Sequence, residues 1–162
     1  MNMNMTRADD AAHDEMPADD VADARALTCV QAMLRGDACS ADLGMELQGA
    51  GAGWAVLNMP VTARMLNGYQ VCHGGMIFAL ADTAFACSCN GYGRVTVAGG
   101  AAIEYLRPAQ LGDVLTAHGR ERKRGQFTGV YDIEVRNQDD QLVALFRGQS
   151  FATQKSIVGL SN

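Results

Sequence analysis

Residues 73–90 read HGGMIFALADTAFACSCN, and the architecture of the chain can be inferred outward from this segment. Nearly every position in it is apolar or small, which is typical of a helix that is buried on all sides. Its length predicts about four turns, from near Gly74 to Asn90, where an Asn-Gly pair supplies a C-terminal stop. We therefore expect one long buried helix at the centre of the molecule.

A single formal charge interrupts this apolar region. The carboxylate of Asp82 is the one formal charge between residues 65 and 93. An isolated ionised carboxylate is costly to bury, so Asp82 must be paired, hydrogen-bonded, shifted in pKa or used in chemistry. Neighbouring backbone donors could equally satisfy it, so this feature alone leaves a structural role open.

The rest of the chain predicts mainly strands. A short amphipathic helix is expected first, capped by Asp20 and closed by Gly36, and residues 66–72 read as a loop. Strand-like runs cover residues 45–49, 54–61, 95–105, 114–122, 127–136 and 142–151. Consecutive strands joined by short turns pair antiparallel, so the expected fold class is α+β, with an antiparallel sheet covering one apolar helix.

The 162 residues, of which 48% are hydrophobic and 19% charged, are enough for one globular domain, placed at residues 21–155. The formal charge of −5 lies in residues 1–20, which hold six acids against one arginine, so the remainder is neutral. A neutral body gives no electrostatic footprint for nucleic acid. We expect residues 1–20 to be a disordered acidic tail and residues 156–162 to be a C-terminal tail.

Targeting and metal signals are missing from the pattern. The N-terminus has no apolar core of a secretory signal, and no apolar run reaches the about 18 residues of a membrane span. The five cysteines are an odd set without the paired spacing of a zinc site. We therefore expect a cytoplasmic protein with reduced cysteines, no bound metal and no membrane partner.

The start of the central helix offers chemistry. The first amides of a helix lack intrahelical acceptors, and the glycines at 74 and 75 let a ligand approach the backbone closely. Gly74 and Asp82 are eight residues apart, so their Cα atoms differ by about 12 Å along the helix axis. A donor from Gly74 and a carboxylate from Asp82 can meet at one carbonyl only if they come from two chains, which predicts a dimer with two equivalent sites.

Two stretches around these residues, LNGYQVCHGG at 66–75 and FALADTAFA at 78–86, resemble the active-site block of the PaaI-type hotdog-fold acyl-CoA thioesterases of phenylacetate degradation. The resemblance extends over about residues 22–152 and includes residues 105–108, 129–134 and 143–148.

The resemblance implies a hotdog fold, a curved antiparallel sheet of five to six strands wrapped around one long central helix. It also implies a homodimer with composite active sites, commonly assembled into a homotetramer. The implied reaction is hydrolysis of an acyl-CoA thioester, with phenylacetyl-CoA or hydroxyphenylacetyl-CoA as the substrate. Coenzyme A then enters as part of the substrate, and no cofactor is required.

The same resemblance assigns roles at the site. Asp82 matches the catalytic carboxylate, as nucleophile or general base, and Gly74 matches the backbone donor to the thioester oxygen. Asn67 matches a polar residue that orients substrate or water, Thr83 an accessory polar group, and His73 a position that supports the loop.

Candidate substrate-binding residues surround these groups. Gly75 continues the glycine pair, and Leu80 and Phe85 could line an acyl pocket, although apolar residues on such a helix are more often core. Arg107, Arg122 and Arg124 are candidates for the CoA phosphates, since arginine forks match phosphate oxygens. For the arginines at 122 and 124, a solvated turn is an equal alternative.

Two rival functions remain open from the sequence. A hotdog hydratase or dehydratase would use a histidine as acid or base, and His73 could be that histidine. A non-catalytic acyl-CoA-binding module would keep the fold, but it has no need of a lone carboxylate such as Asp82 in an apolar helix.

Overall fold

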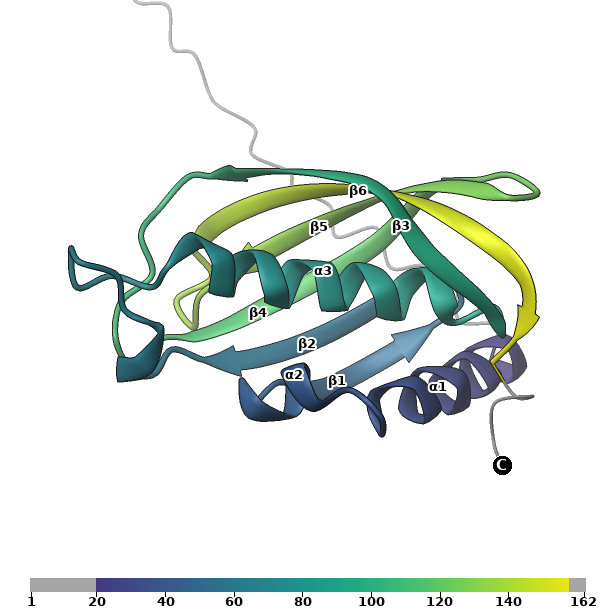
Figure 1. Cartoon of the computed structure of the whole chain (residues 1–162), viewed down its shortest axis with the longest axis horizontal. Helices are drawn as coiled ribbons and strands as arrows, with labels where there is room; N and C mark the ends of the chain where they lie inside the picture. The colour runs from purple at the N-terminus through teal and green to yellow at the C-terminus, as the bar shows by residue number, and fades with distance from the viewer. Residues whose placement is uncertain (1–19, 158–162) are drawn as a thin grey trace, which may run out of the picture.

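A computed structural model describes residues 20–157, which form a six-stranded antiparallel sheet and the helix that the sheet surrounds (Figure 1). The strand order is β1-β2-β4-β5-β6-β3. The strands are β1 (Glu46–Gly51), β2 (Trp54–Pro60), β3 (Arg94–Tyr105), β4 (Val114–Arg124), β5 (Thr128–Arg136) and β6 (Leu142–Ser156). The helices are α1 (Asp20–Leu34), α2 (Ala38–Asp42), a single 3₁₀ turn (Ala63–Met65) and α3 (Gly74–Asn90).

The predicted α+β architecture is confirmed. Figure 1 shows α3 running across one face of the sheet, with β3 curving over it. The long helix, the first helix and all six strands lie where the sequence pattern puts them, within a few residues. The described part of the chain contains no helix long and apolar enough to span a membrane. The cytoplasmic location stays a prediction.

Three local features differ from the sequence expectation. The short helix α2 was not predicted, because five residues are too few to show a helical period. β1 continues to Gly51, which pairs with Trp54, where a longer turn was expected. β6 continues to Ser156, because its polar last residues pair with the start of β3.

Most of the two predicted tails, residues 1–19 and 158–162, lies outside the described residues. The described end of the chain belongs to the domain. Ser156 pairs with Arg94 in the sheet, and Ile157 is buried and donates its backbone N–H to Gly93 O at 3.1 Å. The structured part therefore continues two residues beyond the predicted boundary at 155.

The core lies between α3 and the inner face of the sheet. Alternate residues of β5, namely Tyr131, Ile133 and Val135, point inward and are almost completely buried, which is the period-two pattern of a half-buried strand. Phe85 of α3 packs edge-on against Tyr131 with ring centroids 5.6 Å apart, and against Phe146 at 5.9 Å. This aromatic cluster fixes α3 against the sheet.

Two glycines allow α3 to approach the sheet closely. A Cβ at Gly148 would lie 2.7 Å from the ring of Phe85, and a Cβ at Gly119 would lie 2.3 Å from Ser88 Oγ. Since side chains at these positions would collide with the helix, the helix lies directly on the backbone of β4 and β6 there.

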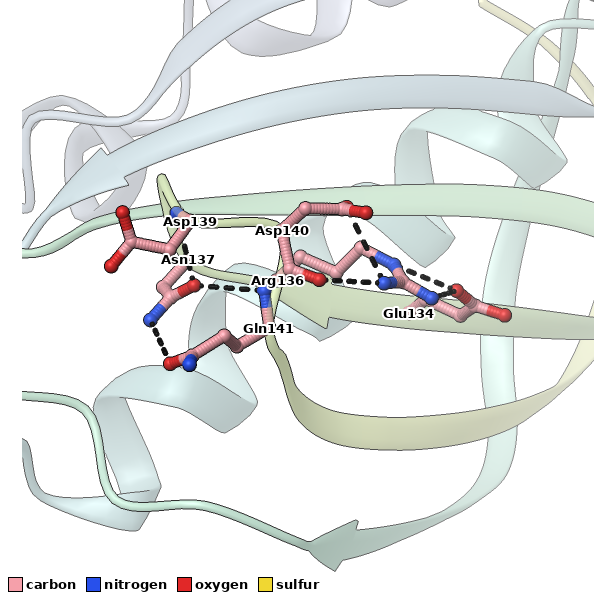
Figure 2. A network of polar contacts seen from close by, with 6 residues as sticks. All are labelled: Glu134, Arg136, Asn137, Asp139, Asp140 and Gln141. Atoms are coloured by element: carbon pink, nitrogen blue, oxygen red, sulfur yellow. Dashed lines mark hydrogen bonds and ion pairs between the residues drawn. The ribbon is translucent and has the colours of Figure 1, made fainter.

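The turn between β5 and β6 is held by its own side chains (Figure 2). Asn137 Oδ1 accepts hydrogen bonds from the backbone N–H groups of Asp139 at 3.2 Å and Gln141 at 2.9 Å. Next to the turn, Arg136 donates through Nε and a terminal nitrogen to one carboxylate oxygen of Glu134, at 3.1 and 2.8 Å. The Asn137 contacts form a side-chain-mediated turn, which is typical of asparagine.

Candidate active site

The loop that leads into α3 is closed on itself by backbone contacts. Leu66 and Cys72 form an antiparallel bridge, and Asn67 N–H donates to Val71 O at 2.8 Å. The loop is also tied to the rest of the fold, because Cys72 N–H donates to Ala109 O at 2.8 Å and His73 N–H donates to Met65 O at 2.8 Å. The approach to the helix start is therefore a fixed platform.

Asn67 organises this loop through its side chain. Its Oδ1 accepts from the backbone N–H of Tyr69 at 2.8 Å and from that of Val71 at 3.4 Å. Because the carbonyl oxygen is held by two amides, the orientation of the side chain is determined, and its NH₂ group remains as a donor. The predicted role in orienting substrate or water stays a prediction, and the structure adds a loop-stabilising role.

His73 caps α3. Its backbone has an extended conformation, with φ −62° and ψ 133°, and its Nδ1 accepts the backbone N–H of Gly75 at 3.0 Å. Since Nδ1 accepts a hydrogen bond, the proton of the neutral ring is on Nε2. His73 thus caps the helix start, and Gly75 N–H is already paired. The loop-supporting role that the resemblance implies stays a prediction.

Gly74 presents the free donor of the first turn. Its N–H is hydrogen-bonded to no other described residue, whereas the N–H groups of Gly75 and Met76 both have partners on His73. An unpaired amide at the positive end of a helix dipole is suited to a carbonyl oxygen that gains negative charge.

Tyr105, at the end of β3, is a neighbour of Gly74, and in the sequence it stands out only as part of residues 105–108, which resemble the family. Its hydroxyl donates to Gly74 O at 2.9 Å. A Cβ at Gly74 would lie 3.0 Å from Cζ of Tyr105 and 3.1 Å from its hydroxyl oxygen, so the ring occupies the space beside the glycine. No sequence pattern could have revealed the contact, because the two residues are 31 positions apart.

Asp82 lies in the middle of α3 and is partly buried. Its carboxylate accepts no hydrogen bond and forms no ion pair with any residue between 20 and 157. Desolvation by burial raises the pKa of Asp82 above the usual value for an aspartate. Of the explanations that the sequence left open, satisfaction by backbone donors is therefore excluded within the described chain.

Thr83, the next residue, faces α2. Its hydroxyl oxygen lies 3.4 Å from Ser40 Oγ, and the hydroxyl of Ser40 donates its own proton to the carboxylate of Asp37. Asp37 also caps α2 by accepting Ser40 N–H at 3.0 Å. The hydroxyl of Thr83 therefore belongs to a chain of polar groups that starts in α2, a contact that could not be predicted from the sequence because α2 itself was not expected.

Gly74 and Asp82 are on one continuous helix, so within one chain they remain about 12 Å apart along the axis. The structure places both groups as the sequence predicted, but it does not bring them to one point. A single reacting carbonyl between them requires a second copy of the chain.

Leu80 and Phe85 are core residues in the described chain. They are 0% and 1% exposed, respectively, and Phe85 packs in the aromatic cluster with Tyr131 and Phe146. This corresponds to the core alternative for these two positions. A role in lining an acyl pocket stays a prediction.

The three candidate arginines do not gather in one place. Arg122 pairs with Asp132 at 2.8 Å. Arg124 lies over the ring of Tyr92, 3.9 Å from its centroid, beyond the C-terminal end of α3. Arg107 is exposed just after β3, two residues from the tyrosine that contacts the N-terminal end of α3. Their role toward CoA phosphates stays a prediction.

The two cysteines of the α3 C-terminal half, Cys87 and Cys89, are poorly suited to chemistry. All five are free, and burial raises the pKa of Cys87 and of Cys89 to about 12. Thiols of that pKa are protonated at neutral pH and are poor nucleophiles and metal ligands. Among residues 20–157 there is also no group of three or more His, Cys, Asp or Glu side chains that could hold a metal ion.

Comparison with known proteins points to one family. Residues 69–144 match the model of the Thioesterase superfamily. The chain is 51% identical over 128 residues to the acyl-coenzyme A thioesterase PaaI of Escherichia coli, a match that covers 79% of this chain and 91% of that protein.

Solved structures agree with the sequence comparison. The structure of E. coli PaaI, from the phenylacetic acid degradation operon, superposes with a TM-score of 0.82 at 47% identity, covering 83% of this chain and 98% of that one. The smu.793 protein of Streptococcus mutans, solved bound to acetyl CoA, superposes with a TM-score of 0.67 at 32% identity, covering 69% and 90%. The hotdog fold expected from the sequence is thereby confirmed.

Proposed function

Because the chain belongs to the thioesterase superfamily, as an acyl-CoA thioesterase of the PaaI type, we propose that it hydrolyses phenylacetyl or hydroxyphenylacetyl thioesters of coenzyme A. The aryl-acetyl substrate is supported by the relative from the phenylacetic acid degradation operon. We further propose that Asp82 and the Gly74 backbone N–H carry the reaction.

The observation that carries this proposal is that the two groups on α3 have no hydrogen-bond partner among the described residues. Gly74 N–H and the Asp82 carboxylate are both polar, and both lack a partner within the described chain. An unpaired, desolvated carboxylate lowers stability, which is the signature of a group kept for function.

The two groups meet if a two-fold axis brings Gly74 of one subunit to Asp82 of the other. We therefore propose a homodimer with two composite sites, and a homotetramer as the complete assembly. The unpaired edge of β3 is consistent with a second copy, since Val97 and Tyr105 on this strand are 49% and 50% exposed.

In the reaction, Gly74 N–H donates to the thioester oxygen as negative charge develops on it. Loss of such a donor costs about 10²- to 10³-fold in rate in other enzymes. Asp82 then acts in one of two ways. As a nucleophile it attacks the carbonyl carbon, the C–S bond breaks, and water hydrolyses the resulting anhydride and restores the carboxylate. As a general base it takes a proton from water, which attacks the carbon while the proton passes to the leaving sulfur.

Both routes balance with water as the only other reactant. We therefore propose that coenzyme A enters as part of the substrate and that the reaction needs no further cofactor. The NH₂ group of Asn67 is available to orient the substrate or this water, since its oxygen is held by the loop.

The test is release of free thiol from a panel of CoA thioesters by the wild type and by Asp82→Asn. We expect the aryl-acetyl esters to be hydrolysed fastest, and kcat of Asp82→Asn to fall about 10²- to 10⁴-fold, the range for a lost acid or base. Asp139→Asn is the matched control, because its carboxylate takes part in none of the contacts of its turn (Figure 2). Full turnover by Asp82→Asn would exclude Asp82 from the reaction, and preference for short fatty acyl esters would exclude the aryl-acetyl substrate.

A further inference from the structure

We propose that Tyr105 is a positioning residue for this reaction, which holds the first turn of α3 so that Gly74 N–H points at the thioester oxygen. The inference rests on the proposed role of Gly74 and adds a residue to it.

The contact that carries the inference joins β3 to the helix start. Tyr105 donates its hydroxyl proton to Gly74 O at 2.9 Å, and its ring lies within van der Waals reach of the Gly74 backbone. Burial raises the pKa of the Tyr105 hydroxyl, so it is protonated at neutral pH and acts as a donor. The first turn is therefore held both along its axis, by the cap on His73, and from the side, by Tyr105.

The strand that carries Tyr105 is itself anchored. The two following residues, Leu106 and Arg107, donate their backbone N–H groups to Val143 O at 2.9 and 3.2 Å. The end of β3 is thus fixed to β6, and a side chain on it can transmit that rigidity to the glycine. Functional groups on helices and strands are held more precisely than groups on loops.

The expected effect follows from how strictly an oxyanion donor must be placed. Such donors work at about 2.7–3.1 Å from the oxygen, and a misplacement of about 1 Å can cost about 10²-fold in rate. Tyr105→Phe keeps the ring and removes only the hydroxyl, so we expect a partial loss, about tenfold in kcat, with KM within about twofold of wild type.

Tyr92→Phe is the matched control. Tyr92 lies just beyond the other end of α3, and its hydroxyl donates to Glu121 Oε2 at 2.8 Å. Both variants lose one hydroxyl hydrogen bond near an end of α3, and because Tyr92 donates to a carboxylate, Tyr92→Phe should lower the melting temperature at least as much as Tyr105→Phe. Only Tyr105→Phe should lower kcat. Equal kcat in the two variants would overturn the proposal, as would a loss of kcat in Tyr105→Phe that only follows a loss of assembly in size-exclusion chromatography.

A double substitution tests the contact from the side of the glycine. In the wild type, Gly74→Ala would press its Cβ against the Tyr105 ring, whereas Tyr105→Leu removes the atoms it would meet. We expect the two substitutions to be non-additive in kcat, with the double variant no worse than Tyr105→Leu alone. Additive losses would overturn the proposal. The wild type, assayed alongside, separates the two levels: if it releases no thiol from the aryl-acetyl esters the proposed function fails, and if it does so while Tyr105→Phe keeps full turnover, the positioning role alone fails.

Discussion

His73 could act as a helix cap alone or also as an acid or base in the reaction, and one pair of variants distinguishes these roles. The imidazole is exposed, and its Nδ1 accepts Gly75 N–H at 3.0 Å as the N-cap of α3. Asparagine is among the best N-cap residues, and its Oδ1 is as many bonds from the backbone as Nδ1 is. His73→Asn therefore keeps the cap and removes the imidazole, whereas His73→Ala removes both.

The magnitudes differ between the two roles. Loss of an N-cap costs about 1 kcal/mol, which lowers Tm by about 2–4 °C in a protein of this size. Loss of a general acid or base costs about 10²- to 10⁴-fold in rate. If His73 is a cap, we expect His73→Asn to keep Tm within about 1 °C and kcat within about threefold of wild type, while His73→Ala melts earlier.

The assay is thiol release from phenylacetyl-CoA together with thermal unfolding of the same preparations. Hydration of an enoyl-CoA by the wild type and by His73→Asn is measured in parallel. A loss of at least about 10²-fold in His73→Asn at unchanged Tm would show that the imidazole takes part in the chemistry and is more than a helix cap.

Two further outcomes follow from the core and from Asp82. Gly148→Ala should destabilise the fold by about 1–3 kcal/mol in urea unfolding, because its Cβ would meet the buried Phe85 ring at 2.7 Å. Gly36→Ala, where only a backbone oxygen lies 3.9 Å away, should be neutral or slightly stabilising, and equal losses would contradict the packing argument. Desolvation raises the pKa of Asp82, so the folded state favours the protonated carboxyl. The stability that the protonated Asp82 contributes is therefore fully present below the ordinary pKa of 3.8. It is lost as the pH rises through the raised pKa of the folded state. Asp82→Asn should thus gain in Tm over wild type as pH rises from about 4 to about 7, and a constant difference would show that the carboxylate is solvated.

The fold could be predicted from the sequence because its signals are local and periodic. The apolar run of α3 and the alternation in β5 each determine an element without reference to the rest of the chain. What the sequence could not reveal depends on contacts between distant positions. The polar end of β6 is a strand only because β3 pairs with it, and the approach of Ser40 in α2 to Thr83 joins residues 43 positions apart.

The candidate site likewise has features that the sequence reveals and features that only the folded structure reveals. The sequence could single out the groups that we propose to carry the chemistry, since a lone Asp in an apolar helix and a glycine pair at a helix start can be recognised from the sequence alone. It could not say which of their polar atoms are already paired. Gly75 N–H is held by His73 and Thr83 faces Ser40, whereas Gly74 N–H and the Asp82 carboxylate have no partner in residues 20–157.

The contrast between paired and unpaired polar groups gives a physical reason for a composite site. A folded chain pairs nearly all of its buried polar groups, because each unpaired one lowers stability by about 1–3 kcal/mol. Here Gly74 N–H and the Asp82 carboxylate, both partly buried, lack a partner among residues 20–157 and lie on one helix, too far apart to satisfy each other or to reach one carbonyl. A two-fold axis that brings Gly74 of one copy to Asp82 of the other places a thioester between a free donor and a free carboxylate. We therefore expect thiol release to depend on assembly: mixing Asp82→Asn with a Gly74→Ala chain should restore one intact site per heterodimer. Mixed and unmixed variants with equally low activity would place both groups in a site made by one chain.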